Sequence, residues 1–166
     1  MRFERGGAAA VLDALERRGA TLALAESLTG GMLCDAFVSV PGASAVVRGA
    51  VVAYATPLKA SLLGVPEALL ARHGAVHPEV ASRMAEGART AASVGDEPAD
   101  VGVATTGEAG PEASGAAPVG LVYVAVADAQ RTLVREHRFS GDRAAIRAQA
   151  VHAAIELLVE SVGSRE

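Results

Sequence analysis

The chain has 166 residues, of which 51% are hydrophobic and 20% are charged, a composition that predicts one globular domain with a buried sheet. The net charge of −4, the scattered basic residues and the absence of an apolar run of ~18 residues argue against a nucleic-acid partner and a membrane span. Cys34 is the only cysteine, which excludes an internal disulfide and a thiolate metal cluster. We therefore expect a cytoplasmic protein.

The first third of the chain alternates between predicted helices and strands. Ala8–Arg18 is rich in Ala and Leu and predicts a helix, and Thr21–Ala25 predicts a short apolar strand. A helix is expected over Met32–Val40, before the turn signal Pro-Gly. Ala45–Tyr54 is dominated by Val and predicts a strand buried on both faces.

Prolines open the next three predicted helices, because proline is well tolerated at the first helical positions. These helices are Pro57–Leu63, Pro66–His73 and Pro78–Ser93. Val101–Thr105 follows as another buried strand, and 107–118 is rich in Gly, Pro and Ala and predicts an irregular loop.

The last part of the chain predicts a hairpin and a long helix. Val119–Ala127 and Thr132–Phe139 are apolar runs separated by four residues, which favours antiparallel pairing. Ser140 or Asp142 can cap a helix over Arg143–Val162. Helices before, between and after the strands predict an α/β fold, a three-layer α/β/α sandwich with a mixed sheet in a single domain over residues 1–166.

Ser27 is the first candidate for chemistry because it stands between a buried strand and a helix, at the sheet edge where open α/β folds bind ligands. Gly30 and Gly31 allow close approach of the backbone, and N–H groups near Thr29–Gly31 could stabilise an oxyanion. The alternative is structural: Ser27 or Thr29 acts only as a helix cap, and the glycines form a tight turn.

Lys59 is the second candidate, and it is the only lysine among 15 basic residues. A serine hydroxyl needs a base to become nucleophilic, and a desolvated lysine with a lowered pKa can serve as that base. The competing interpretation is an ordinary solvated lysine in the first turn of a helix.

Two further polar segments could complete a pocket. Thr106 and Gly107 end a buried strand, and Thr106 could bond the lysine or the substrate, or merely its own turn. Arg143 and Arg147 share a helix face and could hold a phosphate, although Arg147 also suits an exposed salt-bridged face. His73 and His77 have metal-like spacing, but Gly and Pro interrupt the helix, so we expect no metal.

The ordered set of motifs resembles the CinA C-terminal domain family, the nicotinamide-nucleotide amidohydrolases. The resemblance spans nearly the whole chain. It rests on Ala25-Glu26-Ser27 with Thr29-Gly30-Gly31, Gly49 through Tyr54 to Lys59, Leu63-Gly64-Val65, His73-Gly74-Ala75-Val76, Thr106-Gly107 with Ala109-Gly110-Pro111, Pro118-Val119-Gly120, and Phe139–Arg143 with Arg147 and Gln149.

The resemblance implies hydrolysis of nicotinamide mononucleotide to nicotinate mononucleotide and ammonia, without a metal or another cofactor. Ser27 would attack the amide carbon, Lys59 would act as base and then as acid, and Tyr54 and Thr106 would position that pair. The substrate-binding residues implied are Thr29, Gly30, Gly31, Gly107, Arg143, Arg147 and Gln149. A homo-oligomer is also implied.

The chain departs from the family pattern beside these candidates. Leu28 replaces a common Cys, Thr56 an Asn, His77 a small polar residue and Glu108 an Ile. Leu28 excludes an essential thiol at its position. The departures leave open a rival function, a non-catalytic nucleotide-binding or regulatory domain, and a third, hydrolysis of another small carboxamide.

Overall fold

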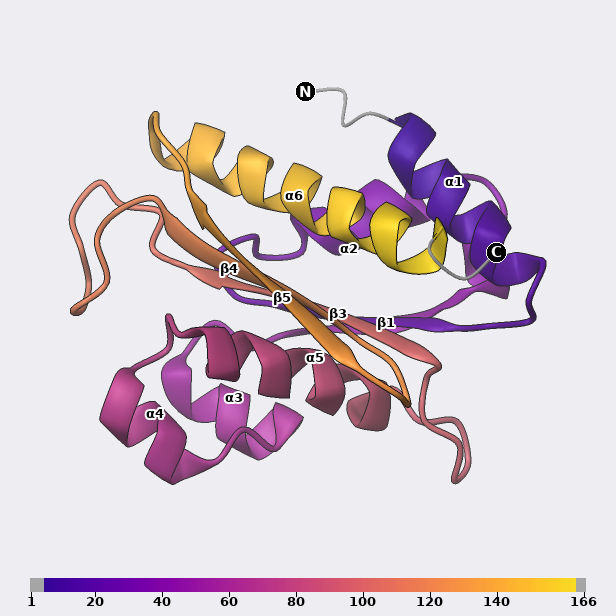
Figure 1. Ribbon diagram of the computed structural model, residues 1–166, viewed down its shortest axis with the longest axis horizontal. Coiled ribbons are helices and arrows are strands. Elements are labelled where there is room, and N and C mark those ends of the chain that lie inside the picture. Colours follow the sequence, from indigo (N-terminus) through magenta and orange to yellow (C-terminus); the bar gives the residue numbers. More distant parts are fainter. Residues whose placement is uncertain (1–4, 164–166) are drawn as a thin grey trace.

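One five-stranded mixed sheet forms the middle layer of the computed structural model, which describes residues 5–163 (Figure 1). The strand order is β2-β1-β3-β4-β5. β1 pairs in parallel with β2 and β3, whereas β3–β4 and β4–β5 are antiparallel. The strands are β1 (Leu22–Glu26), β2 (Val47–Val52), β3 (Val101–Gly107), β4 (Leu121–Ala127) and β5 (Thr132–Arg138).

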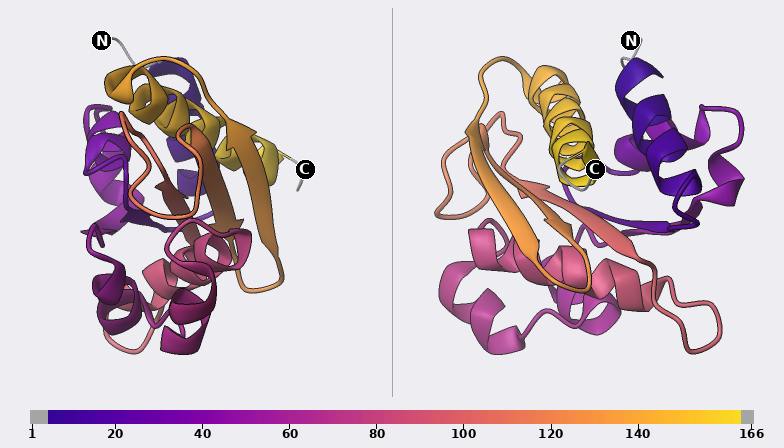
Figure 2. Two further views of the ribbon diagram at one scale, coloured as in Figure 1. Left: turned by 90° about the vertical axis from the view of Figure 1, so that its left-hand side faces the viewer. Right: turned by 45° about the vertical axis from the view of Figure 1, so that its right-hand side comes forward.

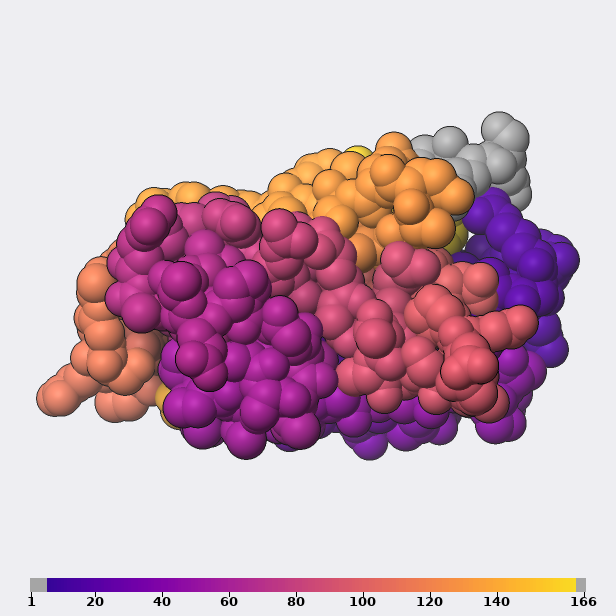
Figure 3. All heavy atoms as spheres, turned by 90° about the horizontal axis from the view of Figure 1, so that it is seen from below, coloured from indigo at the N-terminus to yellow at the C-terminus, as the bar shows by residue number. Residues whose placement is uncertain are grey.

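Helices cover both faces of the sheet, as Figures 1 and 2 show, which confirms the predicted three-layer sandwich with a mixed sheet. One face carries α1 (Arg5–Glu16), α2 (Met32–Val38) and α6 (Arg143–Gly163). The other carries α3 (Thr56–Leu63), α4 (Glu67–His73) and α5 (Pro78–Ala91). Figure 3 views this second face from outside, where α3 and α4 form one end of the surface.

The two faces of the sheet differ in side-chain size, because alternate residues of a strand point to opposite sides. Leu24, Val103 and Val124 face the layer of α1, α2 and α6, whereas Ala25 and Ala104 face α5. The small side chains allow α5 to lie very close to the sheet. A Cβ atom added at Gly102 would stand only 2.0 Å from the carbonyl oxygen of Ala85 on α5.

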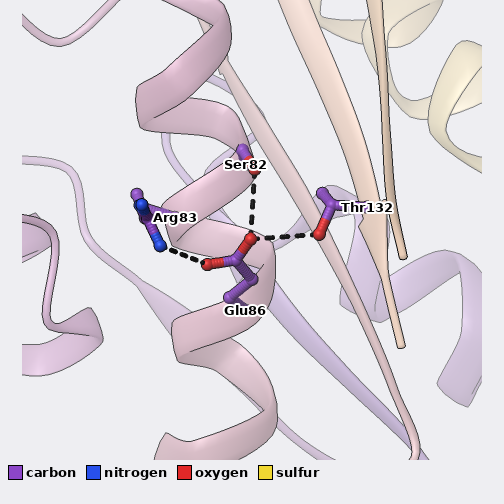
Figure 4. Close-up of polar contacts among 4 residues, drawn as sticks. All are labelled: Ser82, Arg83, Glu86 and Thr132. Carbon is purple, nitrogen blue, oxygen red and sulfur yellow. Dashed lines mark hydrogen bonds and ion pairs between the residues drawn. The ribbon is translucent and has the colours of Figure 1, made fainter. Parts of the chain in front are cut away.

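A polar junction fastens α5 to the edge strand β5 (Figure 4). The Glu86 carboxylate accepts hydrogen bonds from Ser82 Oγ at 3.2 Å and from Thr132 Oγ1 at 3.0 Å, and Arg83 Nη1 lies 3.0 Å from its other oxygen. Thr132 is the first residue of β5, so the junction links two elements that are distant in sequence. Its contacts are internal to the fold, and it lies apart from the predicted site.

Several predicted elements are shorter or more exposed than expected. The predicted strand Ala45–Tyr54 is confirmed only over Val47–Val52, and the expectation that it is buried on both faces is wrong. β2 has a neighbour on one side only, and Val52 is 43% exposed. A run of Val indicates a strand but cannot distinguish an edge from a centre. The helix predicted over Met32–Val40 ends at Val38.

Helix ends follow the predicted capping chemistry in several places. Asp142, not Ser140, caps α6, since its Oδ1 accepts the N–H of Ala145 at 2.8 Å. Proline stands within the first two helical positions of α3 and α5, and Pro66 directly precedes α4. No helix within residues 5–163 combines the length and the apolar character needed to cross a membrane.

Candidate active site

Ser27 follows the last residue of β1 at the carboxyl edge of the sheet, and the neighbouring strands bring other polar residues to the same edge. Its N–H donates to the carbonyl of Thr105 on β3 at 3.1 Å. Its side chain opens onto a cavity of about 280 Å³. The residues lining this cavity are Ser27, Leu28, Tyr54, Thr56, Ala75, Val76, Thr106, Gly107, Glu108, Ala109, Gly110, Glu112, Ser114 and Arg143.

Lys59, on α3, contacts the side chain of Ser27. Its Nζ donates to Ser27 Oγ at 3.0 Å and to the carbonyl oxygen of Ala53 at 2.7 Å. The side chain has no exposed surface, so the interpretation as a solvated surface lysine is wrong. Burial lowers the pKa of Lys59 from its ordinary value of 10.5 to about 8. The neutral amine that a base requires is thus accessible near physiological pH.

The turn after Ser27 depends on Glu26, which sequence reasoning did not single out. This carboxylate is fully buried and accepts the N–H groups of Gly31 at 3.0 Å, Leu33 at 3.1 Å and Cys34 at 2.8 Å. These are unpaired donors at the start of α2, where a negative charge is favourable. The only sequence signal was an acidic residue between a buried strand and a Gly-rich helix start.

Thr29, Gly30 and Gly31 build this turn and do not line the cavity. Gly30 and Gly31 have φ values of +58° and +99°, a backbone region that favours glycine. The Gly30 N–H donates to the Ser27 carbonyl, and the Gly31 N–H donates to Glu26. Neither N–H is therefore free to stabilise an oxyanion, contrary to the expectation. Thr29 shares a buried hydrogen bond with Thr105. Gly31 occupies the N-cap position of α2, so the alternative that Ser27 or Thr29 caps this helix is wrong.

Thr106 and Tyr54 both line the cavity but bond elsewhere. Thr106 Oγ1 donates to the carbonyl of Ala75 at 2.7 Å, and Tyr54, which is 58% exposed, accepts from Arg143 Nη2 at 2.7 Å. Among the described residues, neither side chain makes a hydrogen bond to Ser27 or Lys59. Thr106 therefore shapes the wall of the cavity, and Tyr54 its mouth.

The polar residues of α6 separate into different roles. Arg143 lines the cavity and also donates to the carbonyl of Gly110 at 2.7 Å. Arg147 turns away to the carbonyls of Leu28 and Thr29, so the two arginines do not form the expected paired phosphate site. Gln149 donates to the Ser140 and Ala145 carbonyls and lies outside the cavity lining.

Glu108 adds a negative charge to the cavity wall. Its carboxylate accepts the N–H groups of Gly110 at 3.2 Å and Ser114 at 3.0 Å, and also the Ser114 hydroxyl. Burial by itself would raise the pKa of Glu108, but the hydrogen bonds from Ser114 and Gly110, with the nearby Arg143, lower it below its ordinary value. The Glu108 carboxylate thus holds the loop after β3, which forms one side of the cavity, in a fixed conformation.

Other candidates contribute no chemistry to this site. The rings of His73 and His77 stack with their centroids 4.1 Å apart, and His77 Nδ1 accepts the N–H of Glu79 at the start of α5. Within residues 5–163 no three His, Cys, Asp or Glu side chains are grouped to hold a metal ion. Cys34 is half-buried, and burial, Glu26 and Asp35 raise its pKa, which disfavours a reactive thiolate.

Comparison with known proteins assigns this arrangement to a family. The sequence model of the CinA C-terminal domain family matches residues 5–162 of this chain. The chain belongs to the CinA C-terminal domain family. A CinA-like protein of Frankia casuarinae is 47% identical over 89% of the chain, and a putative competence-damage inducible protein of Caldanaerobacter subterraneus subsp. tengcongensis is 42% identical over 94%.

Solved structures agree with this membership in the CinA family. A CinA superfamily protein of Klebsiella pneumoniae is 32% identical, with a TM-score of 0.90 over 98% of this chain and 99% of its own. The two sequence relatives are much longer, and the match covers only 33% and 37% of them. The chain thus spans about a third of the length of these curated relatives.

Proposed function

We propose that this CinA-family chain is an amidohydrolase that converts nicotinamide mononucleotide to nicotinate mononucleotide and ammonia. The observation that carries the proposal is the buried contact of 3.0 Å between Lys59 Nζ and Ser27 Oγ at the edge of a solvent-connected cavity. A lysine without exposed surface is rare unless it is paired or functional. This lysine has a lowered pKa and a hydroxyl partner, the arrangement of an activated nucleophile.

In the first step, the neutral Lys59 amine removes the Ser27 proton as Oγ bonds to the carboxamide carbon. The resulting ammonium then protonates the amide nitrogen, and ammonia leaves while an ester to Ser27 remains. The Ala53 carbonyl holds Lys59 Nζ at 2.7 Å and so keeps the amine directed at Ser27 in both proton transfers.

In the second step, water enters through the open cavity and gives a proton to the neutral amine as it attacks the ester. Collapse of the intermediate releases the carboxylic acid and returns the proton to Ser27. All proton transfers use Lys59 and Ser27, so the proposed cycle needs no group that this chain does not supply.

The cavity walls support a small polar substrate. Thr106, Glu108 and Arg143 provide polar and charged groups beside Ser27, while Ala75 and Val76 provide apolar surface for a flat ring. The rival function, a non-catalytic nucleotide-binding domain, is favoured by Glu108, whose charge stands where the family commonly has Ile.

Incubation of the purified chain with nicotinamide mononucleotide tests the proposal directly. We expect stoichiometric ammonia and nicotinate mononucleotide from the wild type, and no product above background from Ser27→Ala. The matched control is Ser93→Ala, which removes an exposed hydroxyl two residues after the end of α5. Binding of the nucleotide without ammonia release would support the rival function and refute the amidohydrolase.

A further inference from the structure

Arg147 holds the backbone of the turn that follows the nucleophile. It extends from α6, more than 100 residues away in sequence, and its Nε donates to the Leu28 carbonyl at 2.8 Å and its Nη2 to the Thr29 carbonyl at 3.0 Å. The side chain is half-buried. A guanidinium presents its donors in a rigid planar fork, which suits two neighbouring acceptors better than a lysine would.

The two carbonyls determine where the neighbouring N–H groups point. A trans peptide is planar, so its carbonyl and N–H point in opposite directions. With the Leu28 carbonyl on Arg147, the N–H of Thr29 faces away from the guanidinium. The Thr29–Gly30 peptide is held at both ends, because its carbonyl accepts from Arg147 and its N–H donates to the Ser27 carbonyl at 3.1 Å. The Ser27 carbonyl belongs to the same peptide as the Leu28 N–H, so the Leu28 N–H points away from Gly30.

The close packing at Gly30 supports this view of the turn. A Cβ atom at Gly30 would lie 3.3 Å from Arg147 Nη2, so the guanidinium rests against the glycine backbone. Ser27, Gly30 and Gly31 all use their N–H groups inside the protein, on Thr105, Ser27 and Glu26 respectively. Among the described residues, the N–H groups of Leu28 and Thr29 have no hydrogen-bond acceptor, and Leu28 lines the cavity.

We propose that Arg147 is a positioning residue that, through the turn, orients the free N–H of Leu28 toward the oxyanion formed on attack by Ser27. This inference rests on the proposed function only for the role of Ser27 as nucleophile. Arg147 then binds no substrate phosphate, because both carbonyl contacts belong to the chain itself. Its positive charge on the Thr29 carbonyl also polarises that peptide, so the Gly30 N–H is a stronger donor to the Ser27 carbonyl, which in turn strengthens the Leu28 N–H as a donor.

Steady-state kinetics of Arg147→Met and Arg147→Lys separate positioning from phosphate binding. We expect kcat to fall about 100-fold for Arg147→Met, the loss typical of one oxyanion donor, with KM changed less than about twofold. The loss should be equal for nicotinamide mononucleotide and for nicotinamide riboside, which lacks the phosphate. Arg135→Met, which breaks only an exposed ion pair with Glu160, is the control. A rise in KM confined to the phosphorylated substrate would overturn the proposal.

A fluorophosphonate probe gives a readout that needs no nicotinamide substrate. Ser27 Oγ bonds to phosphorus, fluoride leaves, Lys59 takes the proton, and the phosphoryl oxygen accepts from the same Leu28 N–H. We expect labelling of Ser27 to be about 30-fold slower in Arg147→Met and intermediate in Arg147→Lys, with both variants still folded by circular dichroism. Labelling as fast as in the wild type refutes the role of Arg147. Wild-type labelling without nucleotide turnover refutes only the proposed substrate.

Discussion

Replacement of Lys59 by methionine should abolish most of the amidase activity while leaving the chain folded. Methionine fills a similar volume without an ionisable group, so the packing is kept while the proton transfer and the hydrogen bonds to Ser27 and Ala53 are lost. We expect kcat to fall about 1,000-fold or more. The measurement is ammonia release from nicotinamide mononucleotide. Leu58→Met, a partly exposed position on the same helix, is the control and should keep wild-type kcat.

The pH dependence of the wild type should report the same group. Because the pKa of Lys59 is lowered to about 8, the amine is mostly protonated at lower pH and mostly neutral above it. We therefore expect kcat to rise about tenfold per pH unit below 8 and to level off above it. A flat profile between pH 6 and 9, or Lys59→Met with wild-type kcat, would contradict the role of Lys59 as base.

Stability should change in the opposite direction to activity at this position. The lowered pKa means that the folded chain disfavours the protonated amine by roughly 3 kcal/mol relative to the unfolded chain. That cost is fully present below pH 8 and is relieved as the pH rises from about 8 to 10.5. The free energy of unfolding of Lys59→Met should accordingly exceed that of the wild type at pH 7.

Glu26→Ala should produce the second large effect, on the fold of the turn itself. It leaves three N–H groups at the start of α2 without an acceptor, and we expect a loss of about 3–5 kcal/mol in the free energy of unfolding. For a chain of this size the Tm should drop by roughly 10 °C, as followed by circular dichroism. Kcat should fall as well, because Ser27 adjoins the disrupted segment.

Two matched variants separate the buried carboxylate from a general effect of charge removal. Glu26→Gln keeps one oxygen acceptor and should lose less stability than Glu26→Ala. Glu67→Ala removes an exposed carboxylate from the first turn of α4 and should change the free energy of unfolding by less than about 1 kcal/mol. Equal losses in Glu26→Ala and Glu67→Ala would show that the three hydrogen bonds contribute little.

The layers of the fold could be predicted because each depends on local patterns. Apolar periodicity and proline positions located the helices, and the short gap between Ala127 and Thr132 indicated the hairpin. The exposure of β2 could not be predicted in the same way, since it depends on strand order in the sheet. Val51 and Val52 are the same residue type in the same run, so the sequence predicts equal burial, although Val51 is half-buried and Val52 is exposed at the edge of the sheet.

At the candidate active site, the sequence could indicate which residues matter but not which groups their side chains contact. Ser27 could be located from the strand-to-helix turn, whereas the burial of Lys59 depends on how α3 packs against α5. Helical spacing placed Arg143 and Arg147 on one face, but their long side chains diverge, one into the cavity and the other onto backbone carbonyls. The role of Glu26 depends on the direction of α2 after the turn, which no local pattern encodes.

Rapid acid quenching of the wild-type chain with nicotinamide mononucleotide, followed by intact-mass and peptide mass spectrometry, tests the central claim most directly. The account predicts a transient mass increase equal to the acyl group of nicotinate mononucleotide. It should map to the peptide containing Ser27, be absent in Ser27→Ala and scarcely form in Lys59→Met. Ammonia release by a chain that stays unmodified, or turnover retained by Ser27→Ala, would contradict the acyl-enzyme mechanism.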